Sequence, residues 1–123
     1  MNIISLSRIL AYWAEKQPHG IAVKHNEEYC TWLDIDKTTN RLARAYAALG
    51  VKENDFVTVG LPNSIEFFEA CFAIWKLGAT PQPVSAKLPV FERKQIIEVA
   101  NASLVLGASP EEHPGFTVLE PGF

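Results

Sequence analysis

The stretch from Phe56 to Val84, FVTVGLPNSIEFFEACFAIWKLGATPQPV, decides the fold of this 123-residue chain. It begins with a continuous apolar run, FVTVGL, which predicts a buried strand. Ser64 can cap the helix that follows, because its hydroxyl can accept a backbone N–H in the first turn. Gly78 ends that helix, and TPQPVS predicts a second strand. The stretch therefore predicts a strand, a helix and a second strand, in that order.

The same pattern continues downstream. The segment FERKQIIEVAN, residues 91–101, predicts a helix, and SLVLG, residues 103–107, predicts a third strand. Strands that alternate with helices at this spacing favour right-handed crossovers and a parallel sheet. The expected fold class is therefore α/β, with a βαβαβ parallel sheet over residues 51–107 and flanking helices.

Two prolines constrain the second of these strands. Pro81 and Pro83 are two residues apart, so both missing N–H groups face the same lateral side. No normal ladder can form on that side, whereas Thr80, Gln82 and Val84 can still pair on the other. The strand is expected to be well bonded along one flank only.

Residues 1–50 predict a helix, a hairpin and a second helix. Ser5 or Ser7 can cap a first helix that runs to about Lys16. The runs IAVKH and YCTW predict two short strands around Asn26-Glu27, although this turn lacks the Asn-Gly pair that favours a tight hairpin.

The second helix carries signals at both ends. Thr31 and Asp34 form the aspartate version of a capping box, and Gly50 stands where a left-handed residue ends a helix. The inner face is expected to comprise Leu33, Leu42, Ala45, Tyr46 and Leu49. The solvated face is expected to comprise Asp34, Lys37, Arg41 and Arg44.

The helix expected from Ser64 to Leu77 has almost no polar side. Only Glu66, Glu69 and Lys76 interrupt its apolar surface, and the two glutamates are interpreted as a solvated strip. A surface helix normally has one apolar stripe and one wet face. We therefore expect one face on the sheet and another against protein that this chain lacks. An exposed apolar patch of that size predicts a homodimer.

The bulk composition excludes several classes. The net charge of −3 gives no basic surface for nucleic acid, and there is no apolar run of about 18 residues that could span a membrane. The first ten residues lack the pattern of a signal peptide. Cys30 and Cys71 match no metal spacing and are expected to be reduced and buried, which indicates a cytoplasmic protein.

Motifs of common active sites are also missing. The turn over residues 60–64 holds one glycine and a proline, which cannot supply a nucleotide-binding cradle of N–H groups. No serine lies in a Gly-x-Ser-x-Gly elbow. His19, His25 and His113 are interpreted as surface histidines. The sequence therefore predicts neither a catalytic residue nor a metal ligand in this chain.

Two longer segments carry a resemblance to a known family. They are YCTWLDIDKTTNRLARAYAALGV, residues 29–51, and NDFVTVGLPNSIEFFEACFAIWKLGATPQPV, residues 54–84. In order and spacing they resemble the start of the adenylate-forming (AMP-binding) acyl-CoA ligases. That superfamily also contains luciferases and peptide-synthetase adenylation domains. The segment PQPVSAKLP, with SLVLG further on, is most similar to the branch that includes bile-acid CoA ligases.

The resemblance implies an activity for a complete enzyme. Members activate a carboxylic acid with ATP and magnesium to an acyl-adenylate, and coenzyme A then forms an acyl-CoA thioester. The family's glycine-rich loop and its lysines do not occur here. Residues 1–123 thus resemble part of an N-terminal domain, with 108–123 as a loop and possible strand. The piece is expected to be inactive and to bind none of these cofactors alone. Aliphatic, aromatic and steroid acids all remain open as substrates.

One residue could meet a cofactor in the complete enzyme. Lys87 follows the second predicted strand, and such loops lie at the sheet edge where α/β proteins bind ligands. In related sequences the basic residue of this loop approaches the phosphates of coenzyme A. A lysine offers a point charge without the bidentate contact of arginine. A solvated lysine with no ligand remains the alternative.

Two rival interpretations stay open. The chain could be a self-sufficient α/β binding or signalling module, flavodoxin-like or receiver-like. A receiver needs acidic residues at its strand ends, and FVTVGL and TPQPVS end without them. It could also be a degenerate ligase piece that pairs with another subunit.

Overall fold

The computed structural model describes residues 5–123 and contains two sheets. One is an antiparallel hairpin, and the other is a four-stranded parallel sheet in the order β4-β3-β5-β6. The elements are α1 (Ile9–Lys16), β1 (Ile21–His25), β2 (Glu28–Thr31), α2 (Trp32–Ala48), β3 (Phe56–Val59), α3 (Ile65–Lys76), β4 (Thr80–Pro83), α4 (Val90–Ala100), β5 (Leu104–Leu106), the 3-10 helix η1 (Pro110–Glu112) and β6 (Val118–Leu119). The predicted α/β class and parallel βαβαβ unit are confirmed.

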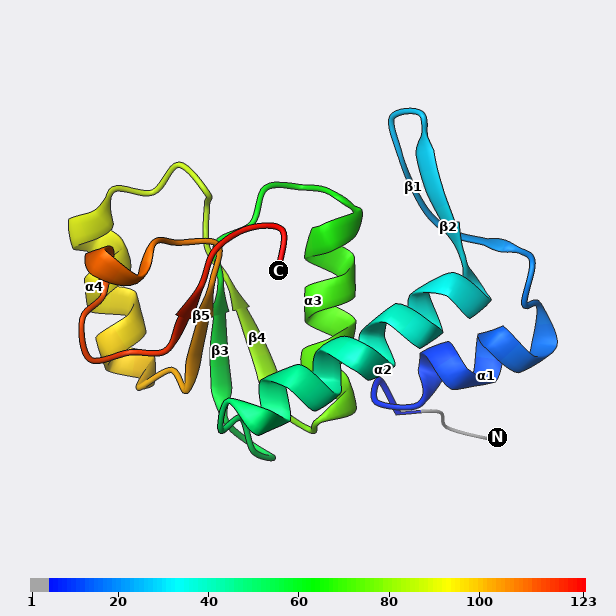
Figure 1. The fold of residues 1–123 in the computed structure, drawn as a ribbon, viewed down its shortest axis with the longest axis horizontal. Helices are drawn as coiled ribbons and strands as arrows, with labels where there is room; N and C mark the ends of the chain where they lie inside the picture. Colours follow the sequence, from blue (N-terminus) through cyan, green and yellow to red (C-terminus); the bar gives the residue numbers. More distant parts are fainter. Residues whose placement is uncertain (1–4) are drawn as a thin grey trace.

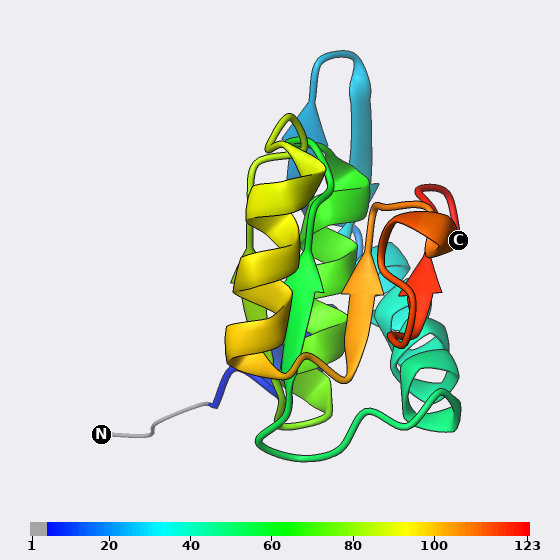
Figure 2. The same ribbon diagram turned by 90° about the vertical axis from the view of Figure 1, so that its left-hand side faces the viewer.

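Helices cover both faces of the parallel sheet (Figure 1). The helix α4 lies on one face, and α3 lies on the other with α2 packed beside it. Chain connections explain this arrangement, because the crossover from β3 to β4 and that from β4 to β5 run in opposite directions across the sheet. The strands β3, β5 and β6 point the same way (Figure 2), so their carboxyl ends meet at one edge.

The strand β4 lies at the edge of the sheet, as its prolines predict. It pairs with β3 alone among the described strands. The N–H of Thr80 donates to Asp55 O at 2.8 Å, and the N–H of Val84 donates to Val59 O at 2.9 Å. Pro81 and Pro83 therefore face the flank where no ladder forms.

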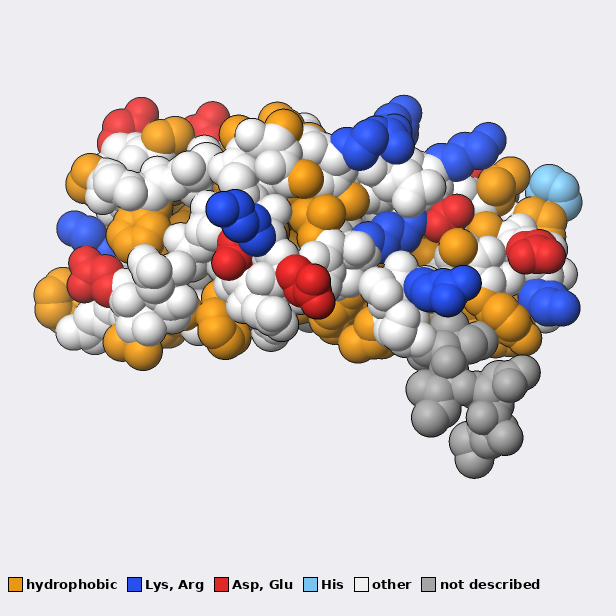
Figure 3. All heavy atoms as spheres, turned by 90° about the horizontal axis from the view of Figure 1, so that it is seen from below, with side chains coloured by type: hydrophobic (Ala, Val, Ile, Leu, Met, Phe, Trp, Pro, Cys, Tyr) orange, Lys and Arg blue, Asp and Glu red, His pale blue; other side chains and the backbone are white. Residues whose placement is uncertain are grey.

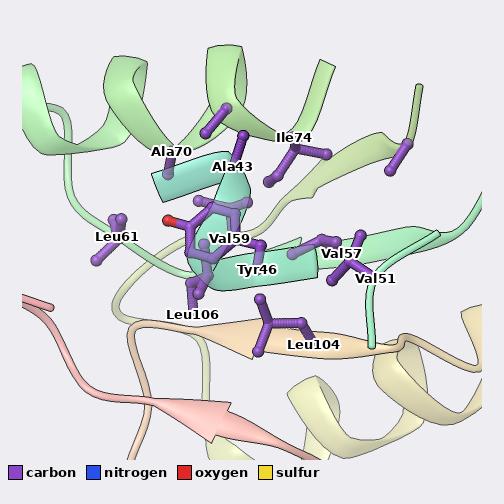
Figure 4. Packing of buried hydrophobic residues seen from close by; sticks show 12 residues of the cluster. Ala43, Tyr46, Val51, Val57, Val59, Leu61, Ala70, Ile74, Leu104 and Leu106 are labelled. Atoms are coloured by element: carbon purple, nitrogen blue, oxygen red, sulfur yellow. The ribbon is translucent and has the colours of Figure 1, made fainter. Parts of the chain in front are cut away.

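The prediction that α3 lacks cover on one side is wrong. The helix α2 packs along it, and the β1–β2 hairpin and the sheet contact it as well. Ala43 and Tyr46 of α2 share one core with Ala70 and Ile74 of α3 (Figure 4). In α3 only Phe68 is exposed, at 44%. The expected homodimer depended on an open apolar face, so the structure gives it no support.

The helix α2 begins as predicted, and its predicted inner face is right in part: Tyr46 is buried, and Leu33, Leu42 and Ala45 are half-buried. Thr31 Oγ1 accepts the N–H of Asp34, and the Asp34 carboxylate accepts the N–H of Thr31, both at 3.1 Å. Leu49 was expected inside, yet it is exposed because α2 ends there, just before Gly50. The buried residues of α2 are Ile35, Thr39, Ala43 and Tyr46. Asp34, Lys37, Arg41 and Arg44, which were expected to be solvated, are exposed. Basic side chains gather over the half of the molecule that holds α1 and α2 (Figure 3).

The start of the first helix, α1, differs from the sequence-based prediction. The helix α1 begins at Ile9 after Arg8, without a side-chain cap, so the expected caps at Ser5 and Ser7 are wrong. The hydroxyls of these two serines instead hydrogen-bond each other at 2.8 Å. The hairpin forms as predicted, and Asn26 supplies the left-handed turn residue with φ of 57°.

A smaller core lies beneath α4. It consists of Ile97, Ala102, Val105, Ala108 and Val118. Polar groups are buried at its border, where Arg93 Nη2 donates to Leu88 O at 3.0 Å and Nη1 lies 3.9 Å from Glu112 Oε1. The expected strand after residue 108 is confirmed as β6, which pairs with β5.

Candidate functional site at the carboxyl edge of the sheet

The carboxyl ends of β3 and β5 approach each other closely at two glycines. The N–H of Gly60 donates to Leu106 O at 2.8 Å, and Gly107 adopts φ of +85°. A Cβ on Gly107 would lie 2.7 Å from Gly60 O, which no side chain tolerates. These glycines allow the two chains to leave the sheet side by side.

A small pocket opens beside these strand ends, on the side of α2 and α3. Its volume is about 70 Å³. The lining residues come from α2, from the segment between β3 and the middle of α3, from the end of β5 and from the last residues of the chain: Thr38, Leu42, Tyr46, Leu61, Glu66, Glu69, Leu106, Gly107, Glu120 and Phe123. The pocket thus combines a carboxylate-rich rim with apolar walls.

The carboxylates of this pocket are not the solvated strip expected from the sequence. Glu66 and Glu69 are both half-buried. Burial raises the pKa of Glu69, the neighbouring Glu66 raises it further, and Arg41 acts in the opposite direction. Burial also raises the pKa of Tyr46, with Glu66 and Glu69 adding to the effect. The pocket therefore carries a negative field around a buried phenol.

The turn into α3 does not form a phosphate cradle. Ser64 Oγ accepts the N–H of Phe67 at 3.2 Å, so one of the free donors at the helix start is satisfied within the chain. Ser64 also donates to Pro62 O at 3.0 Å, and Pro62 has no N–H of its own. The residues of this turn do not fit an ATP site.

Lys87 lies in the loop between β4 and α4, after the carboxyl end of β4. Its side chain is exposed, and its backbone N–H donates to Ser85 Oγ at 3.2 Å. The loop with Lys87 leads to α4, whereas the acidic pocket lies beside α3. These two helices cover opposite faces of the sheet (Figure 1). The structure does not bring Lys87 together with the glutamates.

One histidine departs from the sequence-based interpretation. His19 and His25 are exposed as expected, but His113 is 1% exposed beneath α4. Neither of its ring nitrogens has a hydrogen-bond partner among the described residues. Burial lowers its pKa, and the nearby Arg93 lowers it further. Its position in a proline-containing loop carries no local sign of burial, because α4 covers it only in the folded chain.

Metal and thiol chemistry have little basis here. Within residues 5–123 there is no group of three or more histidine, cysteine or carboxylate side chains able to hold a metal ion. Cys30 is half-buried and Cys71 is buried, and both are free thiols. Burial raises the pKa of the Cys71 thiol to about 11, which makes it a poor nucleophile. No described helix is long and apolar enough to cross a membrane.

The architecture defines a class of protein first. It is an α/β domain with an open parallel sheet, whose loops and pocket gather at the carboxyl edge where such sheets bind ligands. A sequence model described as "AMP-binding enzyme" matches residues 10–120, so the chain belongs to the AMP-binding enzyme family.

Curated relatives place this chain within much longer proteins. Malpibaldin synthetase of Mortierella alpina is 33% identical over 101 residues, which cover 82% of this chain and 2% of that protein. The pyochelin synthase PchD of Pseudomonas aeruginosa is 33% identical over 107 residues, covering 85% of this chain and 19% of the relative. The 2,3-dihydroxybenzoate-AMP ligase of Bacillus subtilis is 38% identical over 68 residues, covering 55% and 13%. The chain thus spans under one fifth of these relatives.

Solved structures share the fold. The o-succinylbenzoate coenzyme A synthetase MenE of Bacillus subtilis, in complex with AMP, superposes with a TM-score of 0.82 at 23% identity, over 90% of this chain and 30% of that one. The N-terminal subdomain of Klebsiella oxytoca NpsA, with 3-hydroxybenzoyl-AMSN, gives 0.84 at 18% identity, over 96% and 30%. The chain therefore has the fold of the N-terminal subdomain of adenylate-forming enzymes.

Proposed function

We propose that this chain is part of an ATP-dependent acid–CoA ligase, which forms an acyl-adenylate and then an acyl-CoA thioester. The observation that carries the proposal is the family match over residues 10–120. The fold shared with a coenzyme A synthetase supports the choice of acceptor. In such a protein ATP and Mg²⁺ would activate a small carboxylic acid. Residues 1–123 would be part of its N-terminal domain and inactive alone.

Lys87 is the residue of this chain that we assign to coenzyme A. Its exposed ammonium, in a loop after the carboxyl end of β4, suits contact with a phosphate at the enzyme surface. We also propose a cytoplasmic location, on the basis of the free thiols of Cys30 and Cys71.

A second candidate is an adenylation domain of peptide-synthetase type. The curated relatives favour it, because malpibaldin synthetase and the phosphinothricin tripeptide synthetase PhsC are both among them. In that case the activated acyl group would pass to a carrier-bound thiol instead of free coenzyme A.

The test requires the protein encoded by the complete reading frame around these residues. Acid-dependent exchange of pyrophosphate into ATP, measured with aliphatic, aromatic and bile acids, is the expected result. A product that forms with free coenzyme A supports the ligase, and one that forms only with a carrier protein supports the second candidate. Bile acids in the panel also test the narrower resemblance of PQPVSAKLP. A stop codon directly after Phe123, or exchange with no acid, would refute both enzymatic proposals.

A further inference from the structure

Residues 109–116, which we call the strap, lie between β5 and β6 and contain η1 and the buried His113. We infer that the strap opens in acid: a proton on His113 releases it from α4 while the parallel sheet stays folded. The inference does not depend on the proposed function, because it uses only residues of this chain.

The backbone of the strap is bonded only to itself. In the described part of the chain its backbone hydrogen bonds run from Glu112 to Ser109, from His113 to Pro110 and from Phe116 to His113. Both ends are fixed, because Ala108 is buried in the smaller core and Thr117 O accepts the N–H of Val105 at 2.9 Å. A segment with only local backbone bonds can open without the elements on either side of it.

Side chains therefore hold the strap closed. Phe116 packs against the smaller core beneath α4. Glu112 Oε1 lies 3.9 Å from Arg93 Nη1, and Ser109 Oγ lies 3.5 Å from a carboxylate oxygen of Glu120 at the surface. Polar contacts of this length contribute little when one partner is partly exposed. His113, at 1% exposed, is the deeply buried polar contact of the strap.

Closure of the strap buries polar atoms that lack partners. Among the described residues, neither ring nitrogen of His113 nor Nε of Arg93 has a hydrogen-bond partner. Burial of such atoms opposes closure. A cavity of about 20 Å³ lies beside the imidazole, which is room for a single water molecule. One water can serve only one of the two ring nitrogens, and it gives a proton a route to the ring before the strap opens.

The charges around His113 determine the direction of the pH response. Arg93, Lys94 and Glu98 approach it from α4, and Glu112 approaches it from η1, whereas β5 and β6 carry no titratable side chain. Burial lowers the pKa of His113, Arg93 and Lys94 lower it further, and Glu112 opposes them. The open strap therefore takes up a proton more readily than the closed one, so opening increases as the pH falls below about 6.5.

Amide hydrogen exchange of the whole chain, corrected for the intrinsic effect of pH on exchange, tests the inference. A single turn such as η1 is not expected to persist away from α4, so the N–H groups of Glu112, His113 and Phe116 report opening. From about pH 7.5 to about pH 5.5 their protection should fall by up to about tenfold, the ratio set by a histidine of ordinary pKa in the open strap. The N–H groups of Val105 and Gly107, which join β5 to β6, should keep their protection.

Matched variants make the inference falsifiable. His113→Leu should remove the pH response of the strap, and His113→Gln provides the same test if the leucine perturbs folding, since neither side chain titrates. Val99→Ala, at a 90% exposed position of α4, is the control and should keep the parent response.

Three results would overturn the inference. The first is the same fall in protection in both His113 variants. The second is an equal loss at Val105 and Gly107, because the whole sheet would then be opening. The third is exchange of the strap amides at their intrinsic rates near about pH 7.5, because the strap would then not be closed.

Discussion

The ammonium of Lys76, near the end of α3, lies 2.7 Å from Oδ1 of Asp36 on α2. It also donates to Asp36 O at 3.1 Å and to Asn40 Oδ1 at 2.7 Å. The side chains of Lys76 and Asp36 are only 10% and 16% exposed. This polar contact explains how an otherwise apolar helix accommodates a lysine against a neighbouring helix.

Replacement of Lys76 by methionine should destabilise the chain. The variant keeps the length of the side chain but leaves Asp36 largely buried without its cation, and removal of one partner of such a pair is costly. We expect a loss of about 2 kcal/mol in the free energy of unfolding, measured by urea titration. Lys37→Met, at an exposed position of α2, is the control and should have little effect. Equal stability of the two variants would contradict the importance of the contact.

The caps of the first two helices should respond differently to alanine. Thr31 satisfies the N–H of Asp34, so Thr31→Ala should cost about 1 kcal/mol of stability. Ser5 does not cap α1, and Ser5→Ala should stay within about 0.5 kcal/mol of the parent. Thermal unfolding of both variants checks the prediction, which fails if Ser5→Ala is the more damaging change.

The glycine at the end of β5 should tolerate no side chain. Gly50 and Gly107 both have positive φ, but a Cβ on Gly50 meets nothing within 4 Å. Gly50→Ala should therefore cost about 1 kcal/mol from backbone strain alone. Gly107→Ala adds a clash with Gly60 O and should cost about 3 kcal/mol or more. Chemical denaturation of the pair separates strain from clash, and similar losses would argue against a close approach of the two strands.

Acidification should weaken the packing of α4 through His113. Burial lowers its pKa below the ordinary 6.5, so the unfolded chain takes up the proton first as the pH falls. The stabilising contribution of neutral His113 is present above about pH 6.5 and declines below it. The free energy of unfolding, measured from about pH 7.5 to about 5.5, should fall more steeply in the parent than in His113→Leu.

A second titrating group bears on the interpretation of that experiment. Glu69 has a raised pKa, so its contribution has the opposite sign: stability is lost as the pH rises through the folded pKa. A parallel pH profile for the parent and His113→Leu would show that His113 does not titrate against folding.

Lys87 should affect only the second step of the proposed reaction, in which coenzyme A forms the thioester. In the complete protein, Lys87→Ala is expected to raise the KM for coenzyme A about tenfold, because one phosphate contact is lost. Acid-dependent pyrophosphate exchange should be unchanged, and Lys87→Arg should restore the parent KM. The exposed Lys94 supplies the control variant Lys94→Ala. An unchanged KM in Lys87→Ala would leave this lysine without a role in cofactor binding.

Local signals in the sequence were sufficient for most of the architecture. The paired prolines of β4 remove two N–H donors from one flank, which predicts that the strand lies at an edge of the sheet, as it does. The capping box at Thr31 and the left-handed Gly50 bounded α2 because both act within a single turn of backbone.

The candidate pocket could not be predicted in the same way. Glu66 and Glu69 form an ordinary solvated strip when α3 is considered alone, and only the packing of α2 half-buries them around Tyr46. The burial of His113 has the same origin, since α4 covers it from another part of the chain.

The sequence alone determined the elements, their order, the parallel crossovers and the family, because these depend on local backbone preferences and on motifs in register. Tertiary structure decided which surfaces are left open. The apolar helix α3 is covered within the chain because α2 packs along it and shares a core with it through Ala43 and Tyr46. Helix–helix contacts between residues about forty positions apart depend on how two surfaces interlock, and periodicity within either segment does not encode that fit.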